Sequence, residues 1–184
     1  MRRPKPWRVS QTRRLIDHPF VRLTEDILVH PDDGRTFKYY YLEGGRHAVA
    51  TVALTNQCKV VLTRQYRHPV GRVIYDLPAG RAKKGEPALE AARRELQEET
   101  GYYANHIEPL TFFNQFPGAV QTGGYIFFAT DLQPGPQHLD RFEDLEVVEL
   151  SIPNAIALVT ENRTIDGSLM LGILFAHAKG LLKE

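Results

Sequence analysis

The segment from Gly80 to Tyr102 constrains this chain more than any other part of its sequence. It follows the pattern G-x5-E-x7-R-E-L-x-E-E-x-G-Y, which places Glu95, Glu98 and Glu99 at helical positions i, i+3 and i+4. Carboxylates at this spacing share one helical face, where each like-charged pair costs roughly a few tenths of a kcal/mol. A solvated acidic face is one explanation, but Mg2+ takes oxygen ligands and would neutralise such a cluster. The pattern therefore predicts a helix that contributes carboxylates to a divalent-metal site.

The same segment predicts where that helix begins and ends. Pro87 suits the first helical turn, because its missing N–H would have no helical partner there. Gly101 suits the C-terminal stop, because glycine adopts a positive φ without steric cost. We therefore expect a helix from Pro87 to about Thr100.

The composition is that of an ordinary globular protein with one domain, or with one domain and a small appendage. The chain has 184 residues, of which 42% are apolar and 24% are charged. Its net charge of +1 gives no indication of a nucleic-acid partner. The one cysteine, Cys58, excludes an intrachain disulfide and a Cys-rich zinc site. We expect Cys58 to be a small apolar residue of the core.

No segment of the sequence has the features of a membrane span or a secretory signal. The longest apolar run, Leu169 to Ala176, is interrupted by Gly172 and is far shorter than the ~20 residues of a membrane helix. The basic residues near the start of the chain are not followed by the apolar stretch of a signal peptide. We therefore expect a cytoplasmic protein without a membrane partner.

The first 45 residues predict a small antiparallel β unit. Strands fit residues 7–16, 20–29 and 36–42, with a turn at 32–34 and a break at Gly44 and Gly45. A unit of this size is too small to be stable alone, so we expect residues 1–45 to pack on another surface.

Residues 46–184 predict a larger α/β domain. Apolar runs that suit strands cover residues 48–54, 60–66 and 74–77 before the acidic helix, and residues 110–114, 125–130 and 146–152 after it. A Pro- and Gly-rich stretch at 132–144 predicts a long loop. A short helix is expected from Pro153 and a longer amphipathic one over residues 168–182. Strands with intervening helices predict an α/β sandwich with a mixed sheet.

Residues 80–102 resemble the signature box of the Nudix hydrolases, G-x5-E-x7-R-E-U-x-E-E-x-G-U, in which U is a bulky apolar residue. Every charged and glycine position matches, and Tyr102 stands as an amphipathic aromatic at the last U position. The resemblance covers the chain from about Gly45 to its C-terminus. It implies the Nudix α/β/α sandwich for residues 46–184, with the β unit of residues 1–45 beside it.

The resemblance also implies roles for the residues of the box. It makes the Ala79 carbonyl and the carboxylates of Glu95, Glu98 and Glu99 the metal ligands, with Glu98 also a catalytic residue. Glu86 would support the site from the loop. Arg94, counted with the catalytic residues, would pair with a carboxylate and hold the loop on the helix. The alternative for Arg94 is a surface cation.

Sequence on both sides of the box resembles the branch of ADP-ribose pyrophosphatases and nucleotide-sugar hydrolases. Gln65-Tyr66-Arg67 precedes the box, and Asp76-Leu77-Pro78-Ala79-Gly80 leads into it, with Asp76 where glutamate is usual. The branch has a proline about fifteen residues past the box, which implies a substrate-binding role for Pro117 and Gly118. Arg67 becomes a candidate clamp for phosphate or ribose, since a guanidinium suits phosphate geometry; the alternative is a surface arginine.

The general base has two candidates elsewhere in the chain, because no acid follows Pro117 and Gly118 where many bacterial members have one. Glu146 matches a glutamate that serves in some family members, and Glu143 is the second choice. The alternative for Glu146 is a solvated acid at a strand edge.

In this branch the N-terminal strands form a small domain that packs across a two-fold dimer and stacks aromatic residues on the nucleobase. That resemblance makes Phe20 and Phe37 the candidates for stacking, with Tyr39 behind them. Their alternative role is in the core. The expected assembly is a homodimer with an isologous interface.

We therefore expect Mg2+-dependent hydrolysis of ADP-ribose to AMP and ribose 5-phosphate, or of related nucleoside diphosphate sugars, with Mn2+ as an alternative ion. The alternative among enzymes is a GDP-mannose or broad-specificity nucleotide-sugar pyrophosphatase. An alternative of another class is a non-catalytic nucleotide-sensing Nudix module, which the intact acids argue against.

Overall fold

The computed structural model describes residues 3–45, 47–161, 163–164 and 166–183, and the chain divides into two compact units. The first unit combines Met1–Gly45 with Asn114–Gly123, and the second combines Arg46–Phe113 with Gly124–Glu184. The segment 114–123 thus belongs to the N-terminal unit, although it follows the acidic helix in the sequence.

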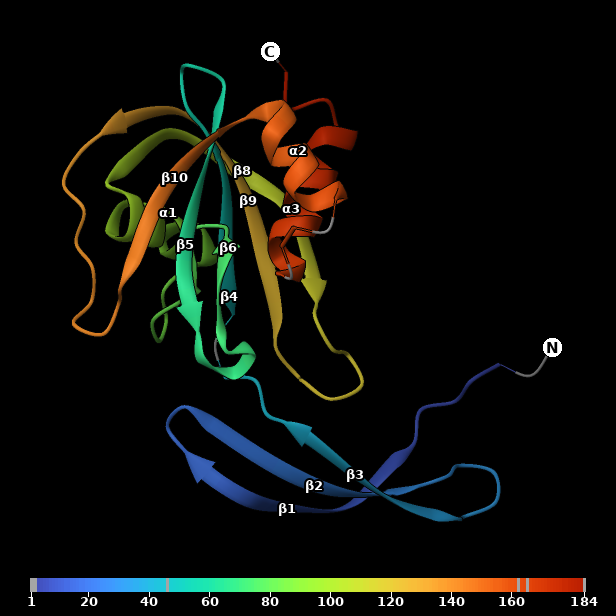
Figure 1. Cartoon of the computed structure of the whole chain (residues 1–184). Helices are drawn as coiled ribbons and strands as arrows, with labels where there is room; N and C mark the ends of the chain where they lie inside the picture. Colours follow the sequence, from blue (N-terminus) through green and yellow to red (C-terminus); the bar gives the residue numbers. More distant parts are fainter. Residues whose placement is uncertain (1–2, 46, 162, 165, 184) are drawn as a thin grey trace. The chain divides into compact units, whose positions relative to one another are not determined.

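The second unit is built on a seven-stranded mixed sheet (Figure 1). Its strand order is β10-β5-β4-β9-β8, with β6 paired to β5 and β7 paired to β4. The β4–β9 pair is parallel, whereas β4 pairs antiparallel with β5 and with β7. The strands are β4 (Ala48–Leu54), β5 (Lys59–Arg67), β6 (Arg72–Asp76), β7 (Ala79–Arg81), β8 (Tyr102–Asn114), β9 (Gly123–Pro134) and β10 (Leu145–Ser151), and a 3-10 turn, η1 (His68–Val70), joins β5 to β6.

Helices cover both faces of this sheet, because its strands bury apolar side chains on both sides. On β4, Val49 and Ala53 pack in the same cluster as Leu96 of α1 (Ala88–Thr100). Ala50 and Val52 belong to the opposite cluster, which includes residues of α2 (Ile152–Thr160) and α3 (Gly167–Ala178). The result is the predicted α/β/α arrangement.

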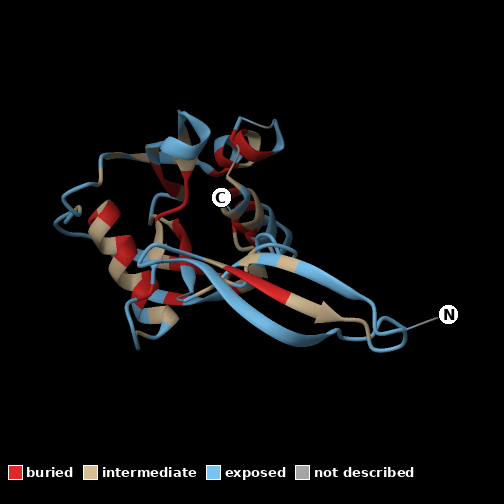
Figure 2. Cartoon of the chain, turned by 90° about the horizontal axis from the view of Figure 1, so that it is seen from below, coloured by how far each residue is buried: buried red, intermediate tan, exposed pale blue. Residues whose placement is uncertain are grey.

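The first unit is a three-stranded antiparallel sheet of β1 (Arg8–His18), β2 (Val21–Val29) and β3 (Thr36–Leu42), in the order β1-β2-β3. Every residue of β1 is exposed. Among the described residues of this unit no hydrophobic side chain is buried; the buried residues of β2 are Thr24, Glu25 and Asp26 (Figure 2).

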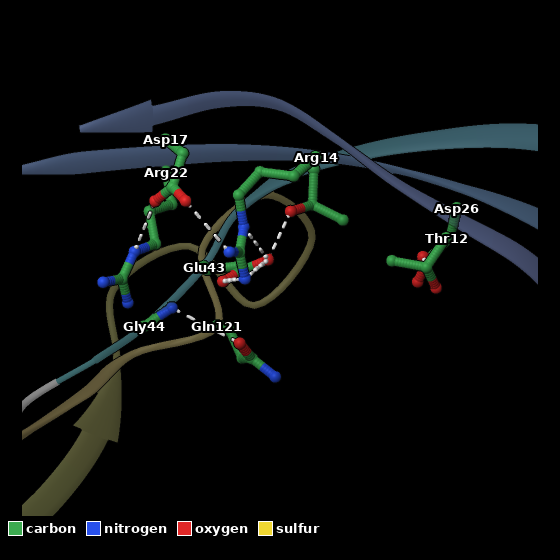
Figure 3. Close-up of polar contacts among 9 residues, drawn as sticks. Thr12, Arg14, Asp17, Arg22, Asp26, Glu43, Gly44 and Gln121 are labelled. Atoms are coloured by element: carbon green, nitrogen blue, oxygen red, sulfur yellow. Dashed lines mark hydrogen bonds and ion pairs between the residues drawn. The ribbon is translucent and has the colours of Figure 1, made fainter.

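Polar contacts take the place of an apolar core in the first unit (Figure 3). Glu43 accepts hydrogen bonds from the Thr24 hydroxyl at 2.5 Å and from Arg14 Nη2 at 3.1 Å. The Thr12 hydroxyl donates to Asp26 Oδ1 at 2.6 Å, so β1 and the buried centre of β2 are joined by side-chain hydrogen bonds.

The predicted strands 36–42 and 48–54 are confirmed with their boundaries. The acidic helix begins one residue after Pro87 and ends at Thr100, where Gly101 has φ 74°. The mixed α/β class and the small antiparallel N-terminal sheet are also confirmed.

Four predictions of local structure were wrong. Cys58 is exposed, with φ 56° in the turn between β4 and β5. β8 begins at Tyr102 rather than residue 110, because an edge strand tolerates Pro109 and polar residues. β9 continues to Pro134, which shortens the long loop to residues 135–144. The last helix, α3, ends at Ala178 rather than residue 182.

A search of the described residues found no helix with the length and apolar character of a membrane span.

Candidate active site

The candidate site lies where β7 and the loop after it meet α1. Gly80 has no room for a side chain, because a Cβ there would lie 2.2 Å from the carboxyl group of Glu95. Opposite it on β4 stands Val49, which packs in the same cluster as α1. Glycine at this position therefore lets the Glu95 carboxylate lie against the backbone of β7.

Arg94 joins the loop after β7 to α1 through several side-chain hydrogen bonds. Its Nε and Nη2 donate to the two oxygens of Glu86, each at 2.9 Å, and Nη2 also donates to the Arg81 carbonyl at 3.2 Å. Glu86 accepts a further bond of 2.7 Å from the backbone N–H of Lys83. The Arg94 guanidinium lowers the pKa of Glu86 to about 2, and the carboxylates around Arg94 raise its own pKa. This bidentate ion pair holds the loop on the helix.

Arg94 also binds two of the predicted metal ligands. Its Nη1 donates to Glu95 Oε1 at 2.9 Å and to Glu98 Oε2 at 2.7 Å. One positive charge therefore lies between these two carboxylates, which offsets the like-charge repulsion of the acidic face.

Glu99 is the most buried of the three acids, with 4% of its surface exposed. Its Oε2 accepts a bond of 2.9 Å from the backbone N–H of Ala79, so the predicted ligands Ala79 and Glu99 are neighbours. Burial raises the pKa of Glu99 to about 8, despite the opposing effect of that hydrogen bond. Burial also raises the pKa of Glu95.

These residues fit a hard divalent cation by the chemistry of their donors. They offer carboxylate and carbonyl oxygens, and no sulfur or imidazole ligand. In the described part of the chain, no three His, Cys, Asp or Glu side chains converge closely enough to hold a metal ion. Arg94 binds oxygens of Glu95 and Glu98, and the backbone N–H of Ala79 binds one oxygen of Glu99.

Arg67, the predicted substrate clamp, is held by Asp76. Its Nε and Nη2 donate to Asp76 Oδ2 at 2.7 and 2.5 Å, and the amide of Gln65 donates to the same oxygen at 3.3 Å. Asp76 is 3% exposed, and burial raises its pKa although Arg67 opposes the shift. The Arg67 side chain is 44% exposed, so a ligand can reach it.

The two candidate bases differ in surroundings. Glu146 is exposed on β10 and pairs with Arg64 of β5 at 3.0 Å. Glu143 lies in the loop 135–144, and its negative charge adds to the effect of burial, which is the main cause of the raised pKa values of Glu95 and Glu99. Glu143 is therefore the candidate whose field acts on the carboxylates of α1.

The loop that carries Glu143 is tied to the end of α1, which the sequence did not indicate. The backbone N–H groups of Gly135 and His138 donate to the carbonyls of Gly101 and Glu98 at 2.6 and 2.9 Å. The Gln137 amide donates to the Glu99 carbonyl at 2.6 Å. These bonds satisfy carbonyls that the end of a helix leaves free, and because most involve backbone atoms they leave no residue pattern to detect.

The remaining candidates lie in the first unit. Phe20 and Phe37 are 80% and 55% exposed. The Tyr39 ring lies 6.1 Å from that of Phe37, and its hydroxyl donates to the carbonyl of Gly118. The structure thus brings Tyr39 and the Pro117–Gly118 segment together within this unit.

Comparisons with known proteins agree with this geometry. The family model for the NUDIX domain matches residues 45–166. The methanol dehydrogenase activator of Bacillus methanolicus is 32% identical over 178 residues, which cover 95% of this chain and 94% of that protein. The ADP-ribose pyrophosphatase of Bacillus subtilis (strain 168) is 34% identical over 138 residues, which cover 74% of this chain and 75% of that protein.

A solved structure confirms the fold. The crystal structure of ADP compounds hydrolase matches with a TM-score of 0.88 and covers 98% of both chains at 21% identity. Nudix hydrolases generally use divalent metal ions, as the acidic face of α1 predicts. With its box intact and the family model matched over most of its length, this chain belongs to the Nudix family of hydrolases.

Proposed function

We propose that this chain hydrolyses the diphosphate of nucleoside diphosphate sugars with Mg2+ as its metal ion, and that ADP-ribose is its leading substrate. The products would be AMP and ribose 5-phosphate, and Mn2+ would serve as an alternative ion. The observation that carries the proposal is the set of three glutamates on α1, of which Glu95 and Glu98 accept from Arg94 and Glu99 accepts from the backbone N–H of Ala79. The name of the Bacillus subtilis relative supports the choice of ADP-ribose.

Glu95, Glu98, Glu99 and the Ala79 carbonyl would hold the metal. When bound, a divalent ion neutralises phosphate charge and lowers the pKa of a water molecule. Arg94 contributes by position: it fixes Glu86 and orients two of the three carboxylates. Glu98, the least buried of the three, with 33% of its side chain exposed, is the acid that a substrate reaches most readily.

Arg67 would bind the diphosphate. Its bonds to Asp76 use Nε and Nη2, and Nη1 has no partner in the described part of the chain. Since Asp76 is buried and also accepts from Gln65, it fixes the guanidinium in one orientation. A fixed guanidinium with a free donor suits phosphate recognition.

Glu143 is the better candidate for the general base. Burial is the main cause of the raised pKa values of Glu95 and Glu99, and the negative charge of Glu143 adds to both shifts. Both carboxylates have a partner, since Glu146 pairs with Arg64 and Glu143 accepts from the backbone N–H of Asp140, so only the charge effect separates the two candidates. We therefore reverse the order that the sequence favoured, and we retain Glu146 as the second candidate.

We also propose that two copies associate through the first unit, which then contributes Phe20, Phe37 and Tyr39, with Pro117 and Gly118, to base binding. A three-stranded sheet needs an apolar face covered to be stable. No hydrophobic side chain is buried among the described residues of this unit, whereas Val9, Ile16 and Val21 are 49%, 47% and 41% exposed. Sedimentation that found only monomer at micromolar concentration would remove this part of the proposal.

Hydrolysis of ADP-ribose, GDP-mannose, UDP-glucose and dGTP, measured side by side with Mg2+ and after chelation, tests the function. AMP and ribose 5-phosphate as dominant products, lost on chelation, would support the proposal. Comparable rates on several sugars would replace ADP-ribose by a broad nucleotide-sugar activity. Turnover that survives removal of all divalent metal would contradict the metal-dependent mechanism.

A further inference from the structure

Arg72 is a charged residue of the second unit that has no role in the site described above. It lies at the start of β6 and is exposed, and its side chain makes no hydrogen bond or ion pair within the described part of the chain. A solvated arginine is the ordinary explanation for such a residue. The position of Arg72 in the sheet, next to Arg67, is what distinguishes it.

Arg67 and Arg72 stand directly opposite each other in the antiparallel pair of β5 and β6. Residues in this relation share a face of the sheet, with their Cβ atoms about 5 Å apart. The register of the pair is continuous from Thr63 to Arg67, so no bulge turns either side chain to the other face. Like charges directly opposite each other destabilise a sheet. Two neighbouring guanidinium groups therefore suit an anionic ligand that neutralises both.

The face that carries the two arginines is the one that α1 covers. Residues of a strand that are an even number of positions apart share a face, so Arg67 lies on the same face as Val61. Val61 packs in the same cluster as Leu96 of α1, whereas Leu62 packs in the opposite cluster. Arg67 and its cross-strand partner Arg72 therefore lie on the side of the sheet that holds the proposed metal ligands.

A short stretch of backbone joins the arginines to those ligands. Arg67 donates to Asp76 through Nε and Nη2. Ala79 follows Asp76 by three residues, which span roughly 11 Å at most. The backbone N–H of Ala79 donates to Glu99 of α1 at 2.9 Å. These contacts place the Arg67 guanidinium within the length of a nucleoside diphosphate sugar from the proposed metal ligands.

We propose that Arg72 is a second guanidinium for the diphosphate of the substrate and acts beside Arg67; this rests on the proposed function for the identity of the ligand. Arg67 uses two of its nitrogen atoms on Asp76, which leaves Nη1 for a ligand. A diphosphate has anionic oxygens on both phosphorus atoms, so one nitrogen leaves part of that charge without a partner. The Arg72 guanidinium supplies further donors, in the planar arrangement that suits phosphate.

The test measures the binding of inorganic pyrophosphate in EDTA, where no divalent metal contributes, by calorimetry. We expect Arg72→Gln to weaken binding roughly 5- to 20-fold and to make it less sensitive to KCl, because a charged contact is lost. Arg72→Lys keeps the charge without the planar fork and should restore part of the affinity. Arg163→Gln is the matched control, because Arg163 is also exposed but follows α2, which packs on the opposite face of the sheet.

Hydrolysis of ADP-ribose by the same variants separates this proposal from the proposed function. In Arg72→Gln we expect KM to rise by about the factor by which pyrophosphate binding weakens, with kcat unchanged. If the parent hydrolyses ADP-ribose and Arg72→Gln matches the control in KM and in pyrophosphate affinity, the role of Arg72 is wrong and the function stands. If the parent hydrolyses no nucleotide sugar, but Arg72→Gln alone loses pyrophosphate affinity, the role stands and the function fails. A loss of activity that Arg72→Lys does not relieve, with pyrophosphate affinity unchanged, would contradict a binding role.

Discussion

The two units of this chain keep their strands together by different means. The second unit buries apolar side chains on both faces of its sheet, from Val49 and Leu96 on one side to Val52 and Ile173 on the other. The first unit buries Thr24, Glu25 and Asp26 and leaves its described apolar side chains exposed or half-buried. A sheet with apolar layers on both faces can stand alone, whereas a polar three-stranded sheet needs a further surface. The proposed metal site lies on the unit with the apolar core, and the other unit is the one that we propose for assembly.

The largest predicted effect is the loss of hydrolysis on substitution of a proposed metal ligand in the second unit. Replacing Glu98 by Gln removes a carboxylate from the proposed metal site, so we expect ADP-ribose hydrolysis to fall on the order of 10³-fold, equivalent to about 4 kcal/mol. Steady-state rates at saturating Mg2+ measure it. Glu90→Gln is the matched control, because Glu90 lies in the first turn of the same helix at a variable position of the box. Equal activity of the Glu98 variant and its control would refute the metal-ligand assignment.

Removing an apolar side chain should lower the free energy of unfolding more in the second unit than in the first. Leu96 is fully buried in the core of the second unit, so Leu96→Ala should lower the free energy of unfolding by about 2–5 kcal/mol. Leu28 is half-buried on β2, and Leu28→Ala should cost less than about 1.5 kcal/mol because less apolar surface is lost. Urea unfolding of both variants tests the comparison. Equal losses would mean that Leu28 is buried in the assembled protein and that the first unit has an apolar core after all.

Assembly should depend on the first unit. Ile16 is 47% exposed on β1, and a charge there would oppose burial against a second copy. Ile16→Asp should weaken dimerisation roughly 10- to 100-fold. Leu174→Asp, at a residue 43% exposed on α3, is the control and should leave the dimer intact. Sedimentation equilibrium over a concentration series measures both, and equal weakening by the two substitutions would remove β1 from the interface.

The sequence predicted the parts of this molecule that depend on local chemistry. The residues of the box predicted the helix and its end at Gly101, because residue spacing determines which side chains share a helical face. The pairing of Arg94 with a carboxylate was implied by the resemblance to the family. Strand β4 was predicted because a buried strand is a continuous apolar run.

The contact between the loop 135–144 and α1 was not predicted, because it joins residues distant in the sequence. Gln137 and His138 meet α1 through its backbone carbonyls, which carry no residue signature. Cys58 was predicted to be buried from its residue type, but the turn at residues 55–59 leaves it exposed. Nothing in the sequence pattern of residues 1–45 indicated that the middle of β2 would bury a glutamate and an aspartate.

The last prediction concerns buried acids, whose pKa values are shifted in opposite directions in the two units. In the first unit, a hydrogen bond from the Tyr40 hydroxyl lowers the pKa of Glu25, so its stabilising effect is present above the ordinary glutamate pKa and is lost in acid. In the second unit, burial raises the pKa of Glu99 to about 8. Between the ordinary value of 4.5 and about 8, the unfolded chain has released a proton that the folded chain retains. Its contribution to stability is therefore lost as the pH rises through that window.

For Glu99 alone, the free energy of unfolding of the chelated protein should fall by roughly 1.4 kcal/mol per pH unit across this range. Urea unfolding between pH 5 and 8 measures the slope, and Glu99→Gln should flatten it because an amide does not titrate. Saturating Mg2+ should also reduce the slope, since a cation favours the charged carboxylate that burial disfavours. A slope that is the same in the parent and in Glu99→Gln would mean that the proton is held elsewhere. The two units would then differ in their apolar packing and not in the direction of the pKa shifts of their buried acids.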